Sequence, residues 1–152
     1  MDTQWLNSLF PDGLKLLLAY GLAFPIGWDR EKEDRSAGLR TFPIVAVASC
    51  ALALVGGSIP GATPETYSRI LQGLITGIGF VGGGAILRSG STVRGTATAA
   101  SIWSIGIVGA ATGLGMYHIA IILSMVTLLT LKFLQPLKDD LDEPPPQREN
   151  LP

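Results

Sequence analysis

The chain has 152 residues, of which 47% are hydrophobic and 15% charged, and its formal net charge at pH 7 is −1. This length allows one domain, and the near-zero charge excludes the basic surface that drives nucleic-acid binding. Three long stretches contain no charged residue, namely residues 41–63, 70–87 and 95–131. A soluble domain of this size needs charge on the outer faces of its helices, so these stretches indicate helices in contact with a lipid bilayer.

The first predicted membrane helix covers residues 11–28 and follows an interfacial lead-in over residues 1–10. At 1.5 Å per residue it is about 27 Å long, close to the thickness of the hydrocarbon core. A dense charged run at residues 29–35 must be aqueous. The second helix is predicted over residues 40–59, and Gly and Pro residues follow it as breakers.

The third helix is predicted from Thr63 to Leu87. Its start has a capping hydroxyl, a proline at the first position and an acid in the first turn. Residues 88–94 are predicted to form a short polar turn. The uncharged stretch that follows is too long for one membrane span, and the Gly113–Gly115 segment is the natural point of division.

The fourth and fifth helices are therefore predicted over residues 95–113 and 116–133. From Pro136 onward the chain is rich in proline and acidic residues, a composition typical of disorder. The domains expected are thus the lead-in, a membrane domain over residues 11–135 and a disordered acidic tail over residues 136–152. The fold class expected is all-α: a polytopic transmembrane bundle of five helices.

The orientation of this bundle follows from its basic residues. With five helices, nine Lys and Arg residues fall on the side that carries the charged run, and two, Lys15 and Arg69, fall on the other. Because basic residues are enriched in cytoplasmic loops, the N-terminus is predicted outside and the C-terminus in the cytoplasm.

The segment Gly77-Ile-Gly-Phe-Val-Gly82 spells the G-x-G-x-x-G pattern of dinucleotide-binding sites. That motif requires a preceding strand and a downstream acid, and both are missing from the sequence around it. Helix packing is the better interpretation, because small residues let transmembrane helices approach closely. An interface between subunits is the alternative. The glycines assigned to packing are Gly73, Gly77, Gly79, Gly83, Gly84, Gly106 and Gly109.

Polar residues at the predicted cytoplasmic boundary are the candidates for binding. Helices two and four both begin there, with Arg40 and Arg94 beside their positive N-terminal ends. Asp29 and Glu31 leave helix one at the same depth, so the four side chains are predicted to converge in one polar pocket. Positive-inside anchoring with surface ion pairs is the simpler alternative. The predicted pocket residues are Asp29, Glu31, Arg40, Thr41, Arg94 and Thr96.

Four blocks of sequence resemble the signature of the MgtC/SapB family. The first two blocks are Gly27-Trp-Asp-Arg-Glu31 and Ala37-Gly-Leu-Arg-Thr41. The third starts with Gly77-Ile-Gly-Phe80 and the fourth with Val93-Arg-Gly-Thr96. The order and spacing of the four blocks match the family over residues 11–134. The resemblance implies a bacterial inner-membrane protein associated with survival in low magnesium. In virulence-associated members it also implies restraint of the F-type ATP synthase.

Two departures from the family pattern limit what can be transferred. The family has a His after the Arg-Thr pair, where this chain has Phe42, and the soluble C-terminal domain of longer members is replaced by a short acidic tail. The leading hypothesis is a non-enzymatic protein that binds another membrane protein in adaptation to magnesium limitation or acid. A transporter of Mg²⁺ or another small solute is the alternative. No catalytic residue, metal ligand or cofactor is expected, and the sequence leaves a homo-oligomer open.

Overall fold

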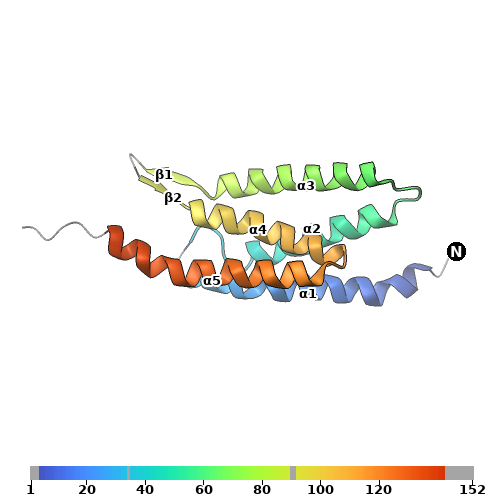
Figure 1. Cartoon of the computed structure of the whole chain (residues 1–152), viewed down its shortest axis with the longest axis horizontal. Coiled ribbons are helices and arrows are strands. Elements are labelled where there is room, and N and C mark those ends of the chain that lie inside the picture. Colours follow the sequence, from blue (N-terminus) through green and yellow to red (C-terminus); the bar gives the residue numbers. More distant parts are fainter. Residues whose placement is uncertain (1–3, 34, 90–91, 143–152) are drawn as a thin grey trace, which may run out of the picture.

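Five helices and one short hairpin make up the computed structural model, which describes residues 4–33, 35–89 and 92–142. The helices run roughly parallel or antiparallel to one another along the long axis of the molecule (Figure 1). This arrangement confirms the all-α class with five helices. Their bounds are α1 Gln4–Lys32, α2 Thr41–Ser58, α3 Pro64–Gly84, α4 Thr96–Gly113 and α5 Tyr117–Asp142.

Helix α4 lies at the centre of the bundle and packs against each of the other four helices. Most of its residues are buried, and they include Ile102, Ile105 and Val108. Small residues on the facing helices, such as Ala46 and Ala23, complete the core. A central helix of this kind can be apolar on all sides, which explains why the sequence of α4 shows no polar stripe.

Helix α3 lies at the edge of the bundle, where it packs against α4 and α2 (Figure 1). It begins as predicted, because the Thr63 side chain accepts a hydrogen bond from the backbone N–H of Thr66 and Pro64 follows the cap. Only Ile78 and Gly82 of this helix are buried. Leu74 and a few others are half-buried against the bundle, and the outer side of α3 is available to lipid or to a partner.

The connection between α3 and α4 differs from the predicted polar turn. Helix α3 ends at Gly84, before the predicted end at Leu87, and an antiparallel hairpin of β1 Leu87–Ser89 and β2 Thr92–Arg94 follows. Gly95 makes the turn into α4 with a φ of +87°, and a Cβ there would collide with the carbonyl oxygen of Ala85. Only glycine fits both requirements, so this residue fixes where α4 begins.

The two outer helices are longer than predicted. Helix α1 already begins at Gln4 and passes through Pro11, so most of the lead-in is helical. Helix α5 continues through Pro136 to Asp142. A proline removes one backbone hydrogen bond, and here the helix continues past it. The structure thus shows a helix over residues 136–142, where the sequence predicts disorder, and residues 143–152 lie outside the described residues. The division into domains stays a prediction.

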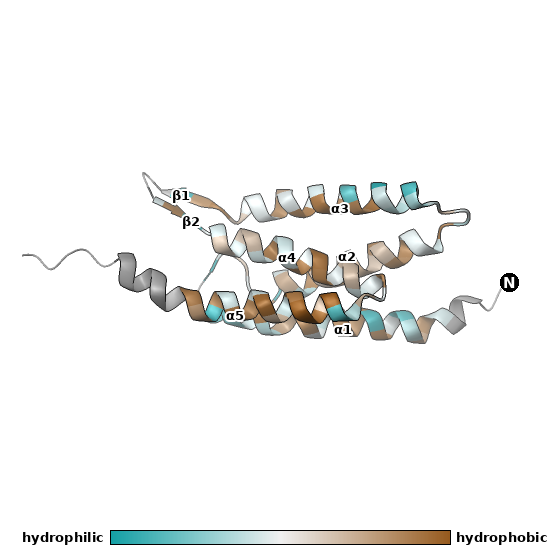
Figure 2. Ribbon diagram, in the orientation of Figure 1, coloured by the Kyte–Doolittle hydropathy of each residue, from teal (hydrophilic) through white to brown (hydrophobic). Residues whose placement is uncertain are grey.

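Three helical segments of the described chain are long and apolar enough to cross a membrane: Ser8–Lys32, Thr41–Ser58 and Tyr117–Leu134. Figure 2 shows hydrophobic residues concentrated along the middle of α5 and hydrophilic residues at the start of α3. Helices α3 and α4 are also at least 18 residues long but are not among these three segments. The five-span topology remains a prediction.

Candidate functional site

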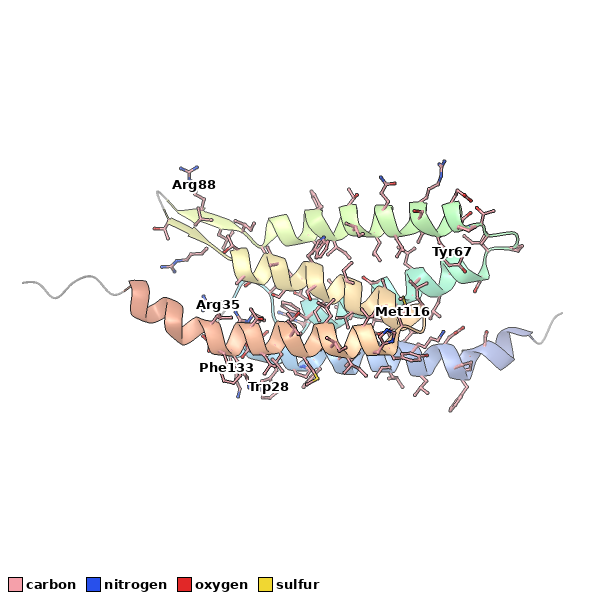
Figure 3. The ribbon with its side chains drawn as sticks, viewed as in Figure 1. Trp28, Arg35, Tyr67, Arg88, Met116 and Phe133 are labelled. Carbon is pink, nitrogen blue, oxygen red and sulfur yellow. The ribbon has the colours of Figure 1, made fainter. Side chains whose placement is uncertain are left out.

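The polar residues singled out by the sequence gather at one end of the bundle. Here α1, α3 and α5 end, α2 and α4 begin, and the hairpin projects (Figure 1). We call this the hairpin end. The labelled side chains Trp28, Arg35, Arg88 and Phe133 all lie toward it, whereas Tyr67 and Met116 lie toward the opposite end (Figure 3).

The last turn of α1 places a buried ion pair at the hairpin end. The Arg30 guanidinium donates to Asp29 Oδ2 through Nε at 3.1 Å and Nη2 at 2.5 Å. The Arg30 side chain is 3% exposed and that of Asp29 13%. A guanidinium so far from water needs a carboxylate beside it, since an unpaired buried charge is costly. The pair is therefore a largely buried polar contact inside the hairpin end of the bundle.

Glu31 performs a different task, at the start of α2. Its carboxylate accepts a hydrogen bond of 3.0 Å from the backbone N–H of Leu39, just before the helix begins. Arg40, at the N-cap position, makes no side-chain capping bond. A carboxylate near free N–H groups stabilises the positive end of a helix. Glu31 thus binds the residue that precedes the N-cap of α2, and this bond ties the loop before α2 to the end of α1.

A third contact joins this loop to α3. Ser36 Oγ donates to the carbonyl oxygen of Ala85, one residue after α3, at 3.1 Å. Ala37 and Gly38 are buried next to it, and a Cβ on Gly38 would collide with the Glu31 carboxylate. The loop is therefore packed onto the bundle between Ser36 and Gly38.

The predicted pocket around Arg40 and Arg94 does not form. Both side chains are exposed, and among the described residues no ion pair joins either of them to Asp29 or Glu31. The physical reason is that each acid has another partner: Arg30 binds Asp29, and the backbone N–H of Leu39 donates to Glu31. The two pocket threonines are also not brought together into a site: Thr41 is half-buried in α2, and Thr96 is exposed at the start of α4.

Sequence reasoning missed Arg30, although helical periodicity could have found it. Ala19, Ala23 and Ile26 are fully buried, and Arg30 continues the same stripe at helical spacing. Its place in a charged run concealed this, because such runs are usually solvated. Ser36 and Gly38 carried no comparable signal, since loop contacts depend on the fold.

The predicted packing glycines divide into two groups. On α4, a Cβ at Gly106 would collide with Ile78 of α3, and one at Gly109 with the carbonyl of Ala46 in α2. Those two positions do support close helix packing. On α3, a Cβ would meet no heavy atom within 4 Å at any of the five predicted positions, Gly73, Gly77, Gly79, Gly83 and Gly84.

The prediction of intrachain packing is therefore wrong for the α3 glycines. Helix α3 is an edge helix, and Gly82 is the glycine that meets α4, with its Cβ position 3.1 Å from the carbonyl oxygen of Ala99. The open glycines leave backbone exposed along the outer side of α3. Phe80 projects among them with 86% of its surface exposed.

The donor set of the described residues does not suit a metal. Nowhere in the described chain do three His, Cys, Asp or Glu side chains gather closely enough to hold an ion. Every buried side-chain nitrogen or oxygen described has a hydrogen-bond partner. The interior is thus an apolar, internally satisfied helix bundle, closed at one end by the Asp29–Arg30 pair.

Three long apolar helices around such a core define a membrane protein. The MgtC family model matches residues 16–140, so the chain belongs to the MgtC family. Protein SrpB of Synechococcus elongatus is 38% identical over 84% of this chain and 75% of its own length. Protein MgtC of Salmonella typhimurium is 38% identical over 79% of this chain, and Protein SapB of Bacillus subtilis is 35% identical over 80%.

The chain spans about half of the MgtC and SapB relatives, 51% and 55% of their respective lengths. The matched residues span the positions of the ion pair and of the loop at the hairpin end, because the family match begins within α1 and extends into α5. No solved structure matches this chain.

Proposed function

We propose that this chain is a non-enzymatic, multi-pass protein of the bacterial inner membrane that acts by contacting another membrane protein. By family resemblance, the contact serves adaptation to magnesium limitation or acid, and the F-type ATP synthase is the candidate partner that the resemblance names. The proposed orientation places the N-terminus outside and the hairpin end in the cytoplasm. It rests on the distribution of basic residues.

The observation that carries this proposal is the outer side of α3. Gly73, Gly77 and Gly84 lie with Phe80 at the spacing of one helix face, and the three glycines have no neighbour within 4 Å. In a membrane, association of helices depends on close backbone approach, which glycine permits. A partner helix could therefore lie against α3 with Phe80 packed beside it.

The alternative, transport of Mg²⁺ or another solute by the chain itself, has weaker support. Mg²⁺ is usually held through carboxylates and retained waters, and cation pathways carry acids that face the bundle interior. Between Gly38 and Leu137 the sequence has one acid, Glu65, at the exposed start of α3. Asp29 is already engaged by Arg30.

Growth of the native host in limiting magnesium tests the proposal. A strain lacking the gene is complemented with wild type, Gly77→Leu or Gly21→Leu. Both glycines are open positions on the helix surface, with no atom within 4 Å of a Cβ, so both variants should fold. We expect Gly77→Leu to accumulate in the membrane but fail to complement, and Gly21→Leu to complement. Full complementation by Gly77→Leu would count against α3 as the contact surface.

A further inference from the structure

The hairpin between α3 and α4 is more exposed than a connection between two packed helices needs to be. The Leu87 and Val93 side chains are 59% and 51% exposed, and Thr92–Arg94 is exposed throughout. Among the described residues no further strand extends this two-stranded sheet. An isolated hairpin of three-residue strands is marginal in water, so an external surface is expected to support it.

The register of the hairpin gives both of its faces the same chemistry. Leu87 pairs with Arg94, and Arg88 pairs with Val93. Directly opposed residues of an antiparallel pair lie on the same face, so each face carries one aliphatic side chain and one arginine. Figure 3 shows the Arg88 side chain extending away from the bundle. Apolar side chains beside long basic ones suit a boundary between hydrocarbon and charged headgroups.

The charge of the hairpin differs from that of the other connection at the same end. Residues 29–40 contain four basic and four acidic residues, so that loop is neutral. The hairpin contains two arginines, and the sequence has no acid from Thr66 to Lys138. The two arginines therefore give the hairpin a formal charge of +2 next to exposed aliphatic surface.

We propose that the α3–α4 hairpin is an interfacial anchor that binds anionic lipid headgroups of the cytoplasmic leaflet. Leu87 or Val93 enters the acyl boundary, and Arg88 and Arg94 bind headgroup phosphates. Anionic lipids give this leaflet a negative surface potential that attracts basic residues next to the membrane. The anchor fixes the cytoplasmic ends of α3 and α4 relative to the bilayer. This inference rests on the proposed membrane placement of the chain.

Fluorescence of a labelled hairpin in lipid nanodiscs tests this anchor. Cys50 is the only cysteine, so Cys50→Ala with Thr92→Cys allows a single environment-sensitive dye on β2. The nanodiscs contain phosphatidylcholine alone or mixed with phosphatidylglycerol, plus lipids with a nitroxide quencher near the headgroup. We expect quenching that increases with phosphatidylglycerol. The paired change R88Q/R94Q should lower the ratio of bound to unbound hairpin about 25-fold, or about fivefold per arginine.

Arg40→Gln is the matched control, because Arg40 is an exposed arginine at the same end but outside the hairpin. It should leave the quenching unchanged. Equal quenching in neutral and anionic nanodiscs, or no effect of R88Q/R94Q, would overturn the proposal. Loss of the quenching on addition of inorganic phosphate, but not of sodium chloride at equal ionic strength, would also overturn it. The hairpin would then bind phosphate in general and not lipid headgroups.

The acidic C-terminal segment of the chain is the competing occupant. If D139N/D140N/D142N/E143Q removes the dye response in both lipids, the hairpin binds this segment and the lipid proposal is wrong. A dye at Met125→Cys, an exposed position within the apolar span of α5, reports membrane insertion itself. Absence of quenching at Met125 by nitroxides deep in the acyl chains would refute the membrane placement. Quenching at Met125 without quenching at Thr92 would refute the anchor alone.

Discussion

Asp29 and Arg30 form the most consequential polar contact in the described part of the chain. The guanidinium is almost fully buried, and it donates through Nε and Nη2 to one carboxylate oxygen of Asp29. Burying a charge pair costs desolvation energy that the pair only partly recovers, whereas removing one partner leaves an uncompensated charge. The pair is therefore weak evidence for added stability but strong evidence for sensitivity to single substitutions.

We expect Asp29→Asn to destabilise the bundle by about 3–5 kcal/mol, since the buried Arg30 guanidinium would lose the Asp29 carboxylate that it binds. Arg40→Gln, at an exposed arginine that forms no ion pair among the described residues, should change stability by less than about 0.5 kcal/mol. Unfolding in mixed micelles of mild detergent and SDS measures both. Equal stability of the two variants would show that Arg30 does not depend on Asp29.

At this scale the sequence identified the right region but the wrong partners. The charged run and the start of α2 do meet at one end of the bundle, as the order of the helices requires. Which arginine binds which acid depended on the phase of α1, which turns Arg30 inward with Ala23 and Ile26. The bond from Leu39 to Glu31 depended on the path of the loop, which no local pattern determines.

The elements differ in how far the sequence determined them. The start of α3 was predicted correctly, because Thr63 and Pro64 are local capping signals. Its early end and the hairpin were missed, since strands of three residues leave little periodicity to read. The glycines of α3 and α4 look alike in sequence. Only the position of each helix, edge or centre, separates their roles.

That separation predicts opposite effects for the same substitution on the two helices. Gly109→Ala places a Cβ against the Ala46 carbonyl and should destabilise the bundle by about 1–3 kcal/mol through overpacking. Gly77→Ala meets no atom within 4 Å and should be neutral or stabilise the helix by up to about 1 kcal/mol. The same detergent–SDS titration measures the stability of both variants. A loss of stability in Gly77→Ala would mean that another residue packs against α3 at Gly77, contrary to the open position described here.

For the whole molecule, the proposed topology predicts which connections are accessible from outside the cell. In the Cys50→Ala background, Pro60→Cys lies between α2 and α3, and Thr92→Cys lies in the hairpin. An impermeant maleimide applied to intact cells with a permeable outer membrane should label Pro60→Cys but not Thr92→Cys. Labelling of the hairpin from outside would reverse the orientation inferred from the nine-to-two distribution of basic residues.

The apolar interior of the molecule predicts that it does not conduct Mg²⁺ on its own. Every described buried polar side-chain atom is satisfied within the bundle, and α4 fills the centre. Purified protein in liposomes that contain a Mg²⁺-sensitive dye should give the same flux as empty liposomes. Flux that depends on the protein and saturates with Mg²⁺ would favour the transporter hypothesis.

The central claim, that the protein acts through a helix bound to α3, is tested most directly by photo-crosslinking in native membranes. A photoreactive phenylalanine analogue replaces Phe80, which projects from the open face of α3, or Met125, an exposed residue on α5. We predict a discrete adduct with another membrane protein from position 80, none from position 125, and loss of the first adduct in Gly77→Leu. Crosslinks to lipid alone from position 80, or the same adducts from both positions, would contradict the claim.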